Sequence, residues 1–94
     1  TDALRRTLKV EAEGARVAYE AAVKELQRFD AETKAMLGGL LRAAESGYRE
    51  GERSVLELLD AQRTETEVAQ RRLDLLLHAK RSEATFRAAQ EGFQ

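Results

Sequence analysis

The chain has 94 residues, in which 16 basic side chains nearly balance 17 acidic ones, and it contains neither cysteine nor proline. The balanced charge produces no overall field that would favour nucleic acid or an anionic membrane, and the lack of cysteine excludes disulfides and thiolate metal sites. Ala, Leu, Glu, Arg and Gln dominate, as in long helices and coiled coils, so we expect an all-α protein.

Small and apolar residues recur with alternating steps of four and three through the first half of the chain. This heptad pattern predicts a coiled-coil helix from about residue 3 to 49. A weaker flanking stripe beside the main one indicates packing on two sides. The main stripe consists of Leu8, Ala12, Ala15, Tyr19, Ala22, Leu26, Phe29, Thr33, Met36, Leu40, Ala43 and Gly47. The flanking stripe consists of Val10, Val17, Ala21, Leu37, Leu41 and Ala44.

The pair Gly38-Gly39 interrupts this helical pattern. Two glycines in a helix interior cost about 1–2 kcal/mol in helix propensity. A tolerated weak point is the favoured interpretation, and a bend or a close helix contact is the alternative.

A turn is expected over about residues 50–53. Gly51 is the best candidate for the helix-ending residue, because glycine adopts the left-handed conformation without steric cost. Ser54 and Glu57 have the spacing of a capping box, in which the hydroxyl accepts from the Glu57 amide and the carboxylate reaches back to the Ser54 amide.

The second helix is expected over about residues 54–92. Its main stripe is less regular, since Glu65, Arg72 and Ser82 interrupt it. A flanking stripe again implies a further partner. The main stripe consists of Leu58, Ala61, Glu65, Val68, Arg72, Leu75, Ala79, Ser82, Phe86, Ala89 and Phe93. The flanking stripe consists of Val55, Leu59, Ala69, Leu73 and Leu76.

The sequence offers little for catalysis or metal binding, so we expect no enzymatic activity, cofactor or metal. His78 is the only histidine and has no second histidine or cysteine to share a metal with. No phosphate-binding loop or catalytic triad can be assembled. The basic residues of the second helix are interleaved with acidic ones and lack aromatic neighbours, which predicts a solvated face rather than a nucleic-acid site. They are Arg71, Arg72, Lys80 and Arg81, with Asp74 and Glu83 among them.

The stretch around the turn carries a more specific signal. Residues 48–63 read YREGERSVLELLDAQR. They resemble the periplasmic-tip motif of the TolC-type outer-membrane efflux proteins, in which Tyr-x-x-Gly-x-x-Ser/Thr is followed by an aliphatic-acidic-aliphatic-Leu-Asp-Ala-Gln pattern. Its Gly-Glu-Arg-Ser and Leu-Glu-Leu-Leu-Asp-Ala segments resemble the heavy-metal branch, the CzcC/CusC-like members, more than the multidrug members. The matching positions are Tyr48, Gly51, Ser54, Leu56, Glu57, Leu58, Leu59, Asp60, Ala61, Gln62 and Arg63.

The resemblance implies a fragment of an α-helical barrel, a long antiparallel hairpin from a larger protein. The parent would be a homotrimeric exit duct in a Gram-negative outer membrane, with this part in the periplasm. The tip would contact a periplasmic adaptor (membrane fusion protein) through residues 51–54, that is Gly51, Glu52, Arg53 and Ser54, beneath which lies an inner-membrane RND pump. Glu57 and Asp60 would line the closed mouth, and Arg53 would take part in polar links between neighbouring hairpins.

Several alternatives remain open from the sequence. The chain could be a free-standing antiparallel coiled coil that serves as a scaffold or adaptor. In the isolated chain Glu57 and Asp60 could serve only the capping box and the favourable helix N-terminus. The cargo of the duct is unspecified, with metal ions slightly preferred to drugs. Because apolar flanks stay uncovered, we expect the isolated hairpin to self-associate, for example as a four-helix bundle of two copies.

Overall fold

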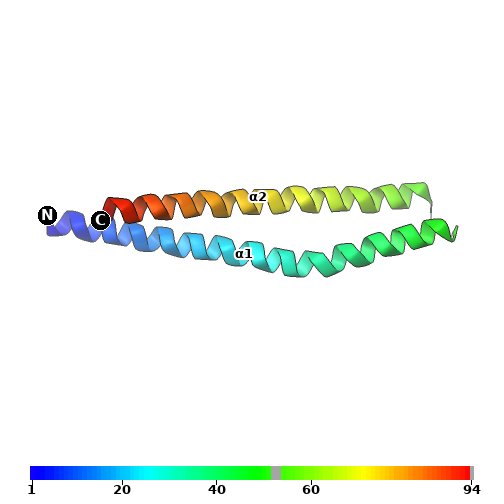
Figure 1. Cartoon of the computed structure of the whole chain (residues 1–94), viewed down its shortest axis with the longest axis horizontal. Coiled ribbons are helices and arrows are strands. Elements are labelled where there is room, and N and C mark those ends of the chain that lie inside the picture. Colours follow the sequence, from blue (N-terminus) through cyan, green and yellow to red (C-terminus); the bar gives the residue numbers. More distant parts are fainter. Residues whose placement is uncertain (52–53, 94) are drawn as a thin grey trace. The chain divides into compact units, whose positions relative to one another are not determined.

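A computed structural model of the protein describes residues 1–51 and 54–93. Helix α1 spans Asp2–Arg49 and helix α2 spans Val55–Phe93, and the two form an all-α helical hairpin without strands in the described residues. The expected bounds of residues 3–49 and 54–92 differ from these by no more than one residue. The chain divides into two units, one of Thr1–Gln27 with Asp74–Gln94 and one of Arg28–Leu73. In each, a segment of α1 runs antiparallel to a segment of α2 (Figure 1).

The unit that contains the two chain ends has a small core built around one leucine. Ala22 of α1 and Leu75 and Ala79 of α2 are buried. The rings of Tyr19 and Phe86 stack with centroids 6.0 Å apart. Val10 and Val17, two members of the expected flanking stripe of α1, are mostly exposed. The main stripe of α1 therefore faces α2 in this unit, and its flank faces solvent.

A polar bond across the helices accompanies this ring contact. The Tyr19 hydroxyl donates a hydrogen bond of 3.0 Å to Oε2 of Glu83, 64 residues away in sequence. This bond to a carboxylate raises the pKa of Tyr19, with the negative charge and a little desolvation adding to the effect.

The hydrogen bond between Tyr19 and Glu83 can be tested by following the ionisation of Tyr19. Tyrosine has an ordinary pKa of about 10, and the chain has only two tyrosines. In a Tyr48→Phe background, absorbance titration should give an ionisation midpoint for Tyr19 above 10, and Glu83→Gln should lower it. Because the folded pKa is raised, the stabilising contribution is complete below pH 10 and is lost as the pH rises through the folded value. Equal midpoints with and without Glu83→Gln would show that the bond does not form in solution.

In the unit that contains the turn, the described residues that are buried are all small. Ala44 and Gly47 of α1 and Ala61 of α2 are buried. Alanine and glycine allow close helix approach but bury little apolar area per contact. Met36, Leu59 and Leu73 in this unit remain half exposed. Much apolar surface of this unit is therefore left uncovered by the hairpin itself.

The contact stripe of α1 differs from the expected one between Thr33 and Gly47, and Gly47 itself is buried as expected. Met36 and Leu40 of the expected main stripe are exposed, whereas Leu37 and Leu41 of the flanking stripe are half buried. The contact side steps by four residues from Thr33 to Leu37 where the heptad pattern predicts three, which is a stutter in the repeat. Our assignment of the main stripe was wrong over this part of α1.

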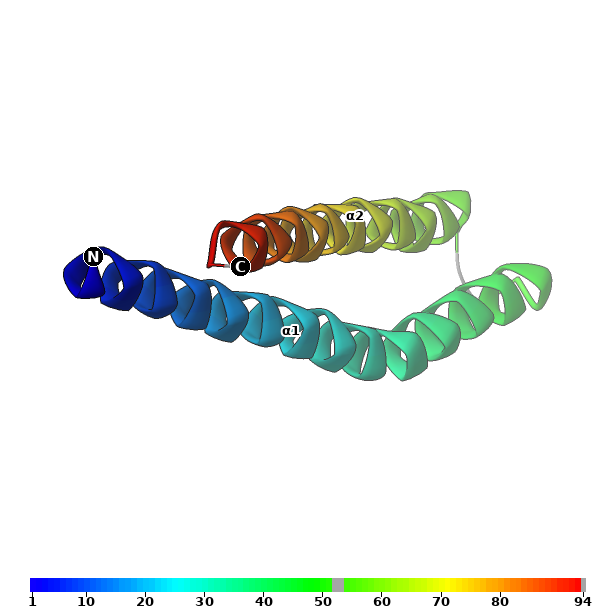
Figure 2. The same cartoon turned by 60° about the vertical axis from the view of Figure 1, so that its left-hand side comes forward.

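The stutter coincides with a bend in α1. Figure 2 shows α1 bending in the stretch coloured between cyan and green, which includes Gly38 and Gly39. A Cβ added at Gly39 would meet nothing within 4 Å, and one at Gly38 would meet only the Arg42 side chain, at 3.5 Å from Nη2. The two glycines therefore mark a bend rather than a close contact, and the favoured interpretation as a mere weak point was incomplete.

Candidate functional site at the turn

The end of α1 is a glycine cap. Gly51 has a φ of 76°, and its amide donates a bond of 3.1 Å to the carbonyl oxygen of Tyr48. This bond has the geometry of the helix-ending motif that places glycine in the left-handed region just past the last helical turn. The chain therefore leaves α1 at the residue that the sequence indicated.

The start of α2 is capped by a serine. The Glu57 amide donates to Oγ of Ser54 at 3.3 Å, and the Leu58 amide donates to the Ser54 carbonyl at the same distance. The first of these is the hydroxyl half of the expected capping box. Glu52 and Arg53, to which the resemblance gives roles in adaptor contact and in gating, lie outside the described residues.

The cap predicts a stability change. Ser54→Ala should lower the free energy of unfolding by about 1 kcal/mol, because one orphan amide of the first turn loses its acceptor. Ser54→Asp is the matched control, since aspartate also accepts this bond and should leave the stability nearly unchanged. Urea denaturation followed by circular dichroism measures both. An alanine variant as stable as the parent would mean that α2 begins elsewhere.

The two acidic residues of the motif lie together beside the turn. Glu57 and Asp60 line one open groove of about 330 Å³. The groove is completed by apolar and hydroxyl residues of both helices, namely Leu40 and Ala44 of α1 and Ala61 and Thr64 of α2. Since Glu57, Asp60 and Thr64 follow one another at steps of three and four, they share one side of α2. The structure thus brings both carboxylates to one face of the hairpin.

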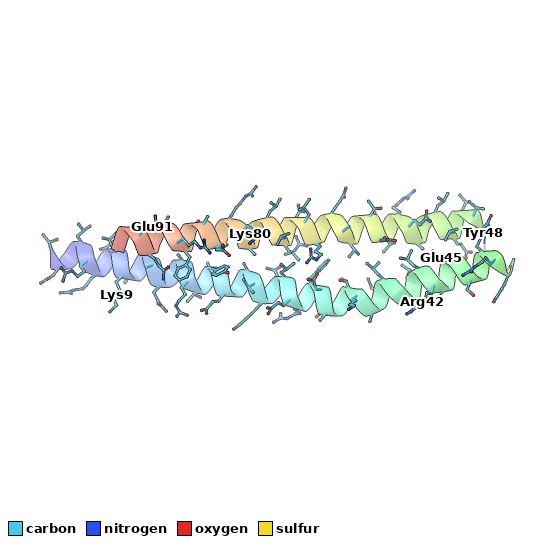
Figure 3. The ribbon with its side chains drawn as sticks, viewed as in Figure 1. Lys9, Arg42, Glu45, Tyr48, Lys80 and Glu91 are labelled. Atoms are coloured by element: carbon cyan, nitrogen blue, oxygen red, sulfur yellow. The ribbon has the colours of Figure 1, made fainter. Side chains whose placement is uncertain are left out.

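Apolar side chains surround the turn on the outside. Leu56 is 72% exposed, and Val55, Leu59 and Tyr48 are each about half exposed. Figure 3 labels Tyr48 on the last turn of α1. Exposed apolar groups gathered at one place commonly mark an interaction surface. The turn therefore combines an acidic groove with an apolar exterior.

A second groove in the same unit was not expected from the sequence. Its volume is about 550 Å³, and it shares no residue with the acidic groove. We call it the ion-pair groove, because Asp30 and Arg72 lie in it. The α1 residues that line it are Asp30, Thr33, Lys34 and Leu37, and those of α2 are Glu65, Val68, Ala69 and Arg72.

The ion pair explains one interruption of the α2 stripe. Arg72 donates from Nε to Asp30 Oδ1 at 2.8 Å and from Nη2 to Oδ2 at 3.2 Å. This two-pronged bond raises the pKa of Arg72. Arg72 is exposed, as expected for a solvated face, but it also forms a cross-helix ion pair that the sequence did not indicate. Glu83 is half buried and accepts from Tyr19, so the expectation was incomplete for these two residues. Thr33, the polar member of the α1 stripe, donates to the Phe29 carbonyl at 2.7 Å.

Other classes of site find no support in the described part of the chain. Among these residues no cluster of three or more His, Cys, Asp or Glu side chains is arranged to hold a metal ion. Within residues 1–51 and 54–93, neither helix contains a stretch long and apolar enough to cross a bilayer. The turn with its acidic groove is thus the feature that we interpret in functional terms.

Comparison with known proteins identified no relative of this chain. No protein-family model, no curated protein sequence and no solved structure matches the chain.

Proposed function

We propose that this chain is the periplasmic helical hairpin of a TolC-type outer-membrane efflux channel subunit. In this role the turn docks a periplasmic adaptor of a tripartite RND-type system, and Glu57 and Asp60 contribute negative charge at the mouth of the duct. The parent protein is a homotrimer of a Gram-negative bacterium. Adaptor and pump select the cargo, with metal ions preferred to drugs.

The main support for this proposal is the position of the TolC-like motif at the turn between the two helices. The sixteen-residue stretch 48–63 brackets the turn between two long helices, with Gly51 ending the first and Ser54 capping the second. A general scaffold needs a turn, but it does not need Tyr48, Glu57 and Asp60 at fixed distances from it. The apolar exterior of the turn and the acidic groove also suit a docking tip with a cation-favouring mouth.

The proposal is tested by site-specific crosslinking to adaptor hairpins. The chain has no cysteine, so Arg53→Cys introduces a single attachment point at the turn. With a reagent that carries a maleimide for this thiol and a succinimidyl ester for lysine amines, this variant should crosslink to the helical hairpin of the adaptor encoded beside the parent gene. Lys24→Cys, exposed on α1 far from the turn in sequence, is the matched control and should give no such product. Equal yields from both positions, or none from position 53, would contradict adaptor docking.

The parent gene offers an independent check. The proposal requires a longer reading frame with a signal peptide, strand segments for a barrel and a second related hairpin. A complete short reading frame beginning near Thr1 would instead support a free-standing coiled coil.

A further inference from the structure

One segment of α1 can face α2 with either of two sets of apolar residues. In the structure, the set that faces α2, which we call the observed register, is Leu37, Leu41 and Ala44. The set that the uninterrupted heptad pattern predicts, which we call the heptad register, is Met36, Leu40 and Ala43. Thr33 and Gly47 belong to both registers, and they are half buried and buried. The two registers therefore differ only within residues 34–46, all of which lie in the unit that contains the turn.

The two registers offer almost the same apolar contacts. The observed register presents two leucines and an alanine, and the heptad register presents a methionine, a leucine and an alanine. An exchange between leucine and methionine is among the core substitutions that cost least, because the two side chains have similar volumes. Apolar burial alone therefore gives the observed register little advantage over the heptad register.

The observed register also contains two opposite local distortions. From Thr33 to Leu41 the contact side advances by two steps of four residues, which unwinds a coiled coil. From Leu41 to Gly47 it advances by two steps of three, which overwinds it. The heptad register alternates steps of three and four and has neither distortion. The bend of α1 lies within this segment (Figure 2), and its paired glycines offer the least resistance to a change of backbone twist.

The facing side of α2 suits both registers. Ala61 is buried, and Thr64 and Val68 are half buried. A rotation of α2 itself by one residue would turn the exposed carboxylate of Glu65 toward α1, which is costly. On α1, by contrast, Met36 and Leu40 are 52% and 38% exposed, so the apolar set of the heptad register is available at the surface. Only α1 therefore has a second apolar side to offer.

We propose that residues 34–46 of α1 switch between the observed and the heptad register, rotating about the helix axis by one residue, or roughly 100°. This inference is independent of the efflux role. Leu40 and Ala44 line the acidic groove, and Leu37 lines the ion-pair groove. In the heptad register Leu40 packs against α2, whereas Leu37 and Ala44 turn away from it. The register of α1 thus sets the shape of both grooves, and a molecule that binds a groove better in one register selects that register.

A single methyl group tests the switch. Met36 is the only methionine of the chain, so its carbon-13-labelled methyl gives one NMR signal that reports the register. Helix register shifts take microseconds to milliseconds, and relaxation dispersion of this signal should show exchange with a second state. The protein is measured at a concentration below that of self-association.

Two neighbouring leucines give a matched pair of variants. Leu41→Gln removes a contact of the observed register only, and Leu40→Gln removes a contact of the heptad register only. Leu41→Gln should raise the ratio of the second state to the first about tenfold, and Leu40→Gln should lower it by about the same factor. A single state in both the parent and Leu41→Gln, or a change of the same sign in both variants, would overturn the proposal.

Solvent access to Met36 identifies the second state. Leu37→Gln combined with Leu41→Gln removes both leucines of the observed register, so Met36 should turn toward α2. Relaxation of its methyl by a soluble gadolinium chelate should then fall at least about twofold from that of the parent, in which Met36 is 52% exposed. Leu40→Gln should keep the parent value. A double variant in which Met36 stays as accessible as in the parent, or which loses its helical circular dichroism, would show that the heptad register does not replace the observed one.

Discussion

Leu75→Ala should lower the free energy of unfolding by about 2–3 kcal/mol. Leu75 is only 5% exposed, and it is the one large aliphatic side chain among the buried residues that the structure describes. The other buried hydrophobic residues are alanines, which have no larger side chain to fill the vacated space. Removing three carbons here therefore deletes the principal apolar contact of the unit that contains the chain ends.

Chemical denaturation at a concentration below that of self-association measures this effect. Leu77→Ala is the matched control, because Leu77 lies two residues away on the same helix but is 42% exposed. Its truncation should cost well under half as much, since less area returns to water. Equal losses for the two variants would show that Leu75 does not face α1.

Ala61→Leu should destabilise the hairpin by about 1–3 kcal/mol through overpacking. Ala61 of α2 and Ala44 of α1 are 4% and 3% exposed and line the same part of the turn unit. A leucine at position 61 must push the helices apart at Ala44 or extend into the acidic groove that Ala61 lines. Either change would disturb the groove that contains Glu57 and Asp60.

Thermal denaturation of Ala61→Leu should be compared with that of Ala84→Leu. Ala84 is exposed on α2 outside both grooves, and leucine there keeps the high helix propensity of the position. The control should therefore melt near the parent temperature. A stabilised Ala61→Leu variant would mean that an apolar gap, and not a close helix contact, exists beside the turn.

The helices, the turn and most of the contact stripes could be predicted because they depend on neighbouring residues. Heptad spacing identifies α1 and α2, and Gly51 and Ser54 mark the boundaries through backbone conformation and capping. The polar residues that interrupt the α2 stripe could be seen in the sequence, but the sequence did not explain them. Arg72 is accommodated by a partner that no local pattern reveals.

The stutter in α1 could not be predicted, because two heptad registers, one residue apart, fit this part of the helix equally well. Met36 with Leu40 and Leu37 with Leu41 are equally apolar pairs, one position apart in the sequence. Which pair faces α2 depends on the path of α1 after its bend. That path depends on how α1 packs against α2, and heptad spacing carries no information about this packing.

The cross-helix bonds could have been found once the turn was located. The turn fixes the register of the hairpin, so residues that lie opposite each other have numbers with a nearly constant sum. This sum is 102 for Asp30 with Arg72 and for Tyr19 with Glu83. Listing charged or hydrogen-bonding pairs with that sum would have suggested both contacts. Periodicity within each helix alone could not, because it says nothing about which residues of the other helix lie opposite.

The proposed function requires that the chain reverse its direction near Gly51. The most direct test is one distance between spin labels at Lys24→Cys and Lys80→Cys, both exposed in the unit that contains the chain ends. Labelled chains are diluted into unlabelled ones so that only distances within a chain are seen. The hairpin predicts a separation of about 30 Å or less, given helix axes about 10 Å apart and the length of the labels. A helix continuing through Gly51 would place the labels roughly 84 Å apart, and that result would contradict the account.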